Sequence, residues 1–113
     1  MAYTNVSLWF TMFINTLTGC RVIKSFKHKG LQDFFFFFFR KGIQTKHSER
    51  LADILDLLHA ADNITVMNFP GAHLHKLSPK KENIYAVKVS GNWRIVFKFI
   101  NGNAYVVDYL DYH

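Results

Sequence analysis

The chain has little cysteine, few acidic side chains and no charge near its beginning. Its single cysteine, Cys20, excludes an intrachain disulfide, so nothing indicates an oxidising compartment and we expect a cytoplasmic protein. The 8 Asp and Glu residues against 14 Lys and Arg residues leave a formal charge of +6. Half of the residues are hydrophobic, which excludes a disordered chain and predicts a globular domain with one core.

The absence of charge from Met1 to Gly19 limits what this stretch can be. A secretory signal begins with a basic region, which is missing, and the stretch is short for a membrane span. Residues 17–20 resemble a lipoprotein cleavage box, but polar residues interrupt the apolar run before it. We expect residues 1–21 to be a poorly specified extension, with a start at Val22 as the alternative, and residues 22–113 to form the domain without a membrane partner.

The basic side chains gather in two blocks. Residues 21–50 hold eight Lys and Arg against two acidic residues, and residues 72–98 hold six against one. Two such blocks on a small domain favour a polyanionic partner, nucleic acid before membrane. A soluble basic protein without such a partner explains the charge equally well, so charge alone does not decide the function.

The C-terminal residues 84–113 contain three apolar runs separated by two turn signals. Asn101-Gly102 suits a type I′ hairpin turn, and Gly91-Asn92 is a weaker signal of the same kind. Aromatic and β-branched residues dominate the runs, which predicts an antiparallel three-stranded meander. Side chains alternate between the faces of a strand, so one face of the middle strand is apolar and needs a cover. That face carries Trp93, Ile95, Phe97 and Phe99, whereas Arg94, Val96 and Lys98 lie on the other.

Two helices upstream are expected to provide the cover. The first contains a run of six phenylalanines and keeps a buried helical spacing at four positions, Leu31, Phe34, Phe35 and Phe38. The other three rings do not fit this stripe. We expect them either to be partly buried against the first residues of the chain or to form an exposed apolar patch. These rings are Phe36, Phe37 and Phe39.

The second helix is predicted over residues 45–61. Thr45 is a suitable N-cap, and a stripe of apolar residues at helical spacing points to the core. The stripe consists of Leu51, Ile54, Leu55 and Leu58, while Arg50, Asp53 and Asp56 are expected to face water.

His73-x-His75 has the spacing of two metal ligands on one strand. Alternate positions of a strand share a face, and two imidazoles suit zinc. A closed site needs further ligands, which Asp111 or His113 would have to supply from a distant part of the sequence. We therefore expect no metal and no other cofactor.

Several polar residues have ordinary structural explanations when each is taken singly. Arg94 would pair with a cross-strand acid such as Asp108, Tyr112 would be a sheet aromatic, and His75 a hydrogen-bonded histidine. Together they suit metal-free cleavage of RNA, which needs proton transfer, a cation for the phosphate and a ring that holds the base. A sheet that presents His75, Arg94, Asp111, Tyr112 and His113 on one concave side would provide these groups.

The segments VIKSFKHKGL, LHKL, NWRIVFKF and DYLDYH carry a resemblance to the HigB branch of the RelE/ParE toxin superfamily, over residues 22–113. The resemblance implies an α+β fold, with two N-terminal helices packed on one face of a curved, mostly antiparallel sheet. It also implies a ribosome-dependent mRNA endonuclease that arrests translation. Its partners would be the ribosome, mRNA and a HigA-like helix-turn-helix antitoxin, with DNA contacted only through the antitoxin.

The resemblance carries site residues over to this sequence. Proton transfer would be carried out by His75 together with His113 or Asp111. Arg94 would stabilise the phosphate, and Tyr112 would position the base. The cleavage would leave a 2′,3′-cyclic phosphate. Ser78 stands where the family has a lysine, and Lys76 where it has a proline. The alternatives are a ParE-like inhibitor of DNA gyrase and an inactive relative, disabled by Ser78 or by the phenylalanine run. Contacts to RNA and the ribosome are expected from Lys76, Lys80, Lys81 and Lys98.

Overall fold

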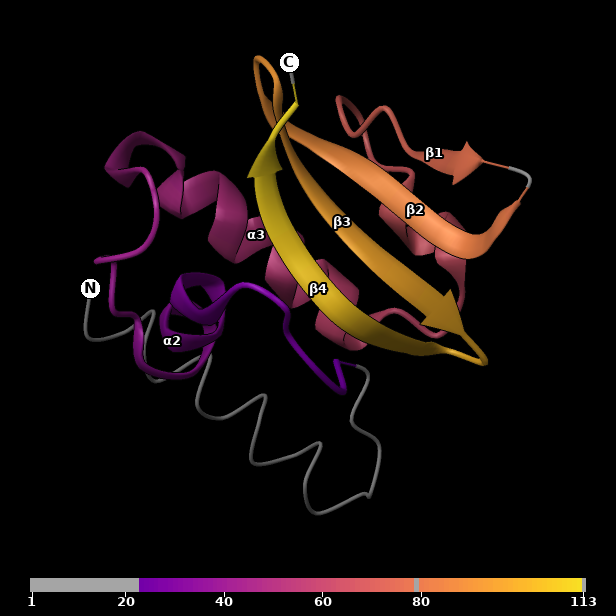
Figure 1. The fold of residues 1–113 in the computed structure, drawn as a ribbon, viewed down its shortest axis with the longest axis horizontal. Helices are drawn as coiled ribbons and strands as arrows, with labels where there is room; N and C mark the ends of the chain where they lie inside the picture. Colours follow the sequence, from indigo (N-terminus) through magenta and orange to yellow (C-terminus); the bar gives the residue numbers. More distant parts are fainter. Residues whose placement is uncertain (1–22, 79, 113) are drawn as a thin grey trace.

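A computed structural model describes residues 23–78 and 80–112 of the chain. Its centre is a four-stranded antiparallel sheet in which each strand pairs with its neighbour in sequence, in the order β1-β2-β3-β4. Two helices, α2 (Lys29–Phe37) and α3 (Ser48–Ala60), contribute to the core on one side of the curved sheet. In Figure 1, α3 runs behind the strands and α2 lies to the left of β4, beside α3. This arrangement confirms the predicted α+β fold class. The strands are β1 (His75–Ser78), β2 (Lys81–Ser90), β3 (Trp93–Ile100) and β4 (Asn103–Asp111).

The three-stranded meander predicted for the C-terminal part corresponds to β2, β3 and β4. The structure adds β1 at one edge, and β2 begins at Lys81, three residues earlier than the apolar run suggested. At the other edge, Ile23 and Phe26 form parallel bridges with Ala104 and Val107 of β4. These bridges protect the edge of β4, although the segment from Ile23 to Phe26 is not a continuous strand.

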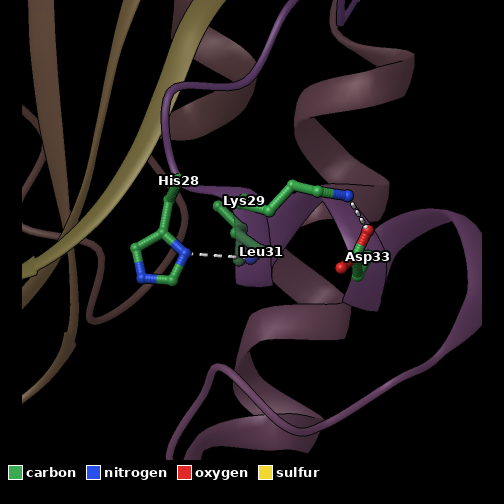
Figure 2. A network of polar contacts seen from close by, with 4 residues as sticks. All are labelled: His28, Lys29, Leu31 and Asp33. Atoms are coloured by element: carbon green, nitrogen blue, oxygen red, sulfur yellow. Dashed lines mark hydrogen bonds and ion pairs between the residues drawn. The ribbon is translucent and has the colours of Figure 1, made fainter.

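Helix α2 is fixed at its N-terminus by a histidine that the sequence did not single out. The His28 side chain is the N-cap, and its Nδ1 accepts a hydrogen bond of 2.9 Å from the Leu31 N–H (Figure 2). One turn along, Lys29 and Asp33 form an ion pair of 2.8 Å. The helix ends where Phe38 takes a left-handed conformation, with φ of 60°. A helix of nine residues is marginal alone, so packing of its apolar side must stabilise it.

The phenylalanine run divides between the core and the surface. Phe34 and Phe35 are buried, as predicted, whereas Phe36 and Phe38 are half-buried against the core. The side chains of Phe37 and Phe39 are 63% and 61% exposed, and their ring centroids lie 5.5 Å apart. These two rings form the exposed patch that was one of the two alternatives; the first residues of the chain lie outside the described part.

Helix α3 begins differently from the prediction. A 3-10 turn over Thr45–His47 precedes it, and His47 is the N-cap residue without a side-chain cap bond. The prediction of Thr45 as the cap was wrong, because the extra turn moves the start of the helix to Ser48. The predicted stripe of apolar residues is correct. Leu51, Ile54, Leu55 and Leu58 are all buried against the sheet.

Arg50 does not face water as expected, although Asp53 and Asp56 do. Its guanidinium donates hydrogen bonds of 3.2 Å to the Gly71 carbonyl and 3.3 Å to the Lys88 carbonyl. It also lies over the Phe69 ring, 5.2 Å from the centroid. Arg50 therefore joins α3 to the loop before β1 and to β2. The helical spacing of Arg50 does not predict these contacts, because its partners come from distant segments of the chain.

The core lies between the helices and the face of the sheet that needed a cover. Buried side chains of the sheet pack there against the buried side chains of α2 and α3. Those of the sheet include Val87, Ile95, Phe97 and Val107. Within the described part of the chain, no helix has the length and apolar character needed to cross a bilayer.

Gly30 and Gly42 allow α2 to contact the loop that follows it. A Cβ atom at Gly30 would lie 2.7 Å from the Gly42 Cα, closer than real contacts permit. In a helix, Gly→Ala gains up to about 1 kcal/mol, whereas overpacking costs about 1–3 kcal/mol. We expect Gly30→Ala to destabilise the protein, measured as a lower urea midpoint. Gln32→Ala on the same helix is the control, and an equal or higher midpoint for Gly30→Ala would contradict the close approach.

Candidate functional site

The face of the sheet that α2 and α3 do not cover is called the open face here. Directly paired residues of antiparallel strands share a face, so the register defines which side chains stand on it. One row consists of Lys88, Arg94 and Leu110, and the next of His75, Ala86, Val96 and Asp108. No described helix covers this face (Figure 1). His75 and Arg94 are therefore on the same side of the sheet.

Arg94 lies beside the turn that joins β2 and β3. Its Nη1 donates hydrogen bonds of 2.7 Å to the Gly91 carbonyl and 3.0 Å to the Trp93 carbonyl. Its cross-strand neighbours are Lys88 and Leu110, so the ordinary structural explanation, a cross-strand pair with Asp108, does not apply to it. No direct carboxylate neighbour faces Arg94 across these two strands, and Lys88 adds a second positive charge on the same row.

The end of β4 reaches the same turn. The Tyr112 N–H donates a hydrogen bond of 2.8 Å to the Asn92 carbonyl, and the end of β4 lies next to the β2–β3 turn (Figure 1). Asp111 pairs with Trp93, whose side chain packs against the core. By alternation, Asp111 is directed to the helix-covered side, so the expectation that it shares a concave face with Arg94 was wrong. His113 lies outside the described residues.

His75 is the first residue of β1 and is exposed, with its Nδ1 3.1 Å from the His73 carbonyl oxygen. Two strand spacings separate it from β3, and its row is the one next to that of Arg94, two residues along the strands, so about 10 Å across the sheet and about 7 Å along it separate the backbones. His73 precedes the strand and has a φ of 48°, so alternation does not align the two imidazoles. Among residues 23–78 and 80–112, no three His, Cys, Asp or Glu side chains are grouped to hold a metal ion.

The four lysines expected to contact RNA occupy different places. Lys98 of β3 is on the open face, and Lys80 in the β1–β2 turn lines a hollow of that face together with Lys98. Lys76 pairs with Tyr85 and stands on the other side of β1, where it is exposed. Lys81 is the first residue of β2 and pairs with Ser78.

An aromatic cluster supports this end of the sheet from the helix-covered side. The rings of Trp93 and Tyr109 stack with centroids 4.6 Å apart, and the Tyr109 hydroxyl lies 2.7 Å from Nδ1 of the buried His47. Burial raises the pKa of the Tyr109 phenol, and the charge of Asp111 raises it further, while the N–H of Gln44 acts in the opposite direction. The cluster fixes the position of β4 two residues before Asp111.

The stability of the protein should depend on pH through His47. Burial lowers the pKa of this histidine, and the charge of Lys46 lowers it further. Below the unfolded-state pKa of about 6.5, the unfolded chain therefore binds more protons than the folded one. We expect the free energy of unfolding to fall as the pH decreases from about 7 through this window, measured by urea titration. His47→Gln should flatten this dependence, and an equally steep dependence in that variant would contradict the assignment.

Sequence reasoning missed several residues of this region. Lys88 could have been found, because the turn at Gly91-Asn92 places it opposite Arg94. The place of Asp108 could not be predicted, because it depends on a bulge in β4. The place of Lys27 could not be predicted either, because its segment joins the sheet from outside the meander.

Comparison with known proteins places the chain in a class. The model of a family described as RelE-like toxin of type II toxin-antitoxin system HigB matches residues 24–113. Endoribonuclease HigB of Proteus vulgaris is 40% identical over 92 residues, which cover 81% of this chain and 100% of that protein. An uncharacterized protein of Haemophilus influenzae is 38% identical over 64 residues, which cover 56% of this chain and 62% of that protein.

The fold, a sheet covered by helices on one face and uncovered on the other, agrees with the RelE-like class of toxins. The match covers most of the chain, and the chain belongs to the HigB-like toxin family of type II toxin–antitoxin systems. Membership implies an antitoxin as its partner.

Proposed function

We propose that this protein is an endoribonuclease that cleaves mRNA on the ribosome and so arrests translation. The observation that carries the proposal is Arg94, a cation with a cationic neighbour on an uncovered sheet face, in a chain 40% identical to an endoribonuclease. A guanidinium presents parallel donors to phosphate oxygens and remains charged at every physiological pH. It can therefore stabilise the charge that develops on a phosphate under attack.

The remaining steps need groups that transfer protons and hold the base. His75 is on the open face with Arg94, and imidazole transfers protons near neutral pH. Tyr112 follows β4 beside the same turn, and its ring can stack on an unpaired base. We assign His113 to proton transfer as the second group. Asp111 is better suited to an indirect role through Tyr109, because the register directs it to the covered side.

The distance between the backbones at His75 and Arg94 has a consequence for the reaction. Because about 10 Å across the sheet and about 7 Å along it separate the two backbones, a phosphodiester and its neighbouring ribose fit between the two side chains and can bridge them. RNA held in line on the ribosome would present that bridge. We infer that the ribosome orients the substrate, and that a HigA-like helix-turn-helix antitoxin prevents this encounter in the cytoplasm.

Induction of the protein in cells that lack the antitoxin tests the proposal. Primer extension on a translated message should reveal breaks that disappear when translation of that message is prevented. Attack by the ribose 2′-oxygen leaves a 2′,3′-cyclic phosphate and a 5′-hydroxyl, so the downstream fragments should accept labelled phosphate from polynucleotide kinase without prior phosphatase treatment. Intact message together with damaged DNA would refute the proposal in favour of gyrase inhibition. Normal growth of the induced cells would refute both.

A further inference from the structure

The open face is hollowed at the end away from Arg94. The hollow has a volume of about 620 Å³ and is lined by side chains from all four strands, from the β1–β2 turn and from the segment before α2. It extends around Lys98, four residues along β3 from Arg94, so the two places are about 13 Å apart on one face. Its apolar floor includes Leu77, Ile84 and Val96, and its cations are Lys27, Lys80 and Lys98.

A strained bulge in β4 forms one wall of this hollow. Val96 pairs with Asp108 and Lys98 with Tyr105, so two residues of β4 stand opposite Phe97. Val106, one of these two, has a φ of 47° and is 46% exposed. A left-handed conformation is unfavourable for a residue with a side chain, and most unfavourable for a β-branched one.

Ser25 holds the bulge in this conformation. The Ser25 hydroxyl accepts a hydrogen bond of 2.8 Å from the Val106 N–H, and the Ser25 carbonyl accepts one of 3.1 Å from the Val107 N–H. Bulges change the direction of side chains, and strained residues that a neighbouring segment fixes are concentrated at binding sites. Here the strain exposes an apolar side chain at the rim of a basic hollow.

The hollow carries more cations than carboxylates. Lys27 and Lys98 line it, and Asp108 is the one carboxylate among the described residues of its lining. The Nζ of Lys27 lies 4.0 Å from Asp108, at the limit of an ion pair, and the Lys27 side chain is 72% exposed. The Asp108 Oδ1 instead accepts a hydrogen bond of 2.9 Å from the Tyr109 N–H. The hollow therefore offers an apolar floor and an excess of positive charge.

We propose that this hollow binds one nucleotide of an RNA strand whose cleavage site is at Arg94. Its phosphate would contact Lys98 and Lys27, and its base and ribose would cover the floor formed by Val96 and its neighbours. The inference rests on the proposed function for the identity of the ligand. An acidic peptide would meet the same cations, but a continuous open face between the hollow and Arg94 favours a strand that occupies both.

Binding of a 2′-O-methyl oligoribonucleotide, measured by fluorescence anisotropy at several salt concentrations, tests the inference. This probe cannot be cleaved, because its 2′-oxygen is blocked. Each lost phosphate contact on a single strand lowers the slope of log K against log salt by about 0.7, and weakens binding about fivefold at ~0.1 M salt. We expect this change for Lys98→Ala, with the slope retained by Lys98→Arg. Lys41→Ala, which removes an exposed charge outside the hollow, is the matched control.

Each of the other possible results has a different meaning for the hollow. An unchanged slope for Lys98→Ala, an equal change for Lys41→Ala, or no binding by the wild-type protein would overturn the inference. If Lys98→Ala loses binding to a nucleoside monophosphate but binds the strand normally, the hollow is instead a site for free nucleotides. Loss of antitoxin binding alone would indicate a protein docking site. A Lys98-dependent slope in a protein that leaves messages intact would refute the proposed function and retain the hollow as a strand-binding site.

Discussion

Replacing Arg94 by alanine is expected to lower mRNA cleavage about 10²- to 10³-fold, the usual effect of removing one donor that stabilises a transition state. The side chain stands on the uncovered face, with Lys88 and Leu110 as its cross-strand neighbours. Its guanidinium contacts only backbone carbonyls among the contacts described, those of Gly91 and Trp93, so it can turn to a phosphate without breaking an ion pair. Cleavage in a purified translation system would measure the effect.

The same substitution should leave the fold intact. It removes two hydrogen bonds at the surface, each worth about 1 kcal/mol net, which is a small part of the stability of a domain. Arg94→Lys separates charge from geometry, since lysine keeps the charge and loses the planar fork. Arg40→Ala, an exposed arginine in the loop after α2, is the matched control. An Arg94→Ala protein that folds and still arrests growth would exclude Arg94 from the reaction.

The second large effect is expected within the phenylalanine run. Phe35→Ala should cost about 3–5 kcal/mol, because it leaves a cavity in a well-packed core. The Phe35 side chain is 2% exposed, and its ring contacts those of Phe26 and Phe36 with centroids 5.6 Å and 5.2 Å away. A domain of this size has a total stability of about 5–15 kcal/mol, so this loss removes a large share of it.

Phe37→Ala, two residues further on, is the matched control. Its side chain is 63% exposed, and surface substitutions change stability by about 0.5 kcal/mol or less. Urea unfolding of the two variants would therefore show a large and a small decrease. Equal decreases would mean that the exposed rings are covered in the folded protein. Removing Phe37 and Phe39 together should also reduce aggregation, because contiguous exposed aromatic rings favour association.

Much of the fold could be predicted because its signals are local. The turn at Asn101-Gly102 and the alternation in β3 predicted two antiparallel pairings and the face that needs a cover. Helical spacing then identified the stripe of α3 that provides it. The N-terminus of α3, the contacts of Arg50 and the whole of β1 were missed or placed wrongly, because each depends on segments far away in the sequence.

The candidate site was predicted in part, since a sequence gives the residue types but not the register. Arg94 and His75 stand on one face, as the proposal requires, whereas the pairing of Asp111 with Trp93 turns its side chain to the other. The bulge at Val106 shifts the pairing of β4 by one residue, so Asp108 stands opposite Val96 and not opposite Ile95. A shift of one residue exchanges the faces of all side chains beyond it.

The sequence by itself determined the strands of the meander, the apolar faces that form the core and the family to which the chain is similar. These follow from periodicity and turn residues, which act over a few positions of the chain. The tertiary structure decided which polar side chains share the open face, where the hollow lies and which phenylalanines are buried. These depend on strand register, on the bulge that Ser25 holds and on contacts between distant segments, none of which a local pattern specifies.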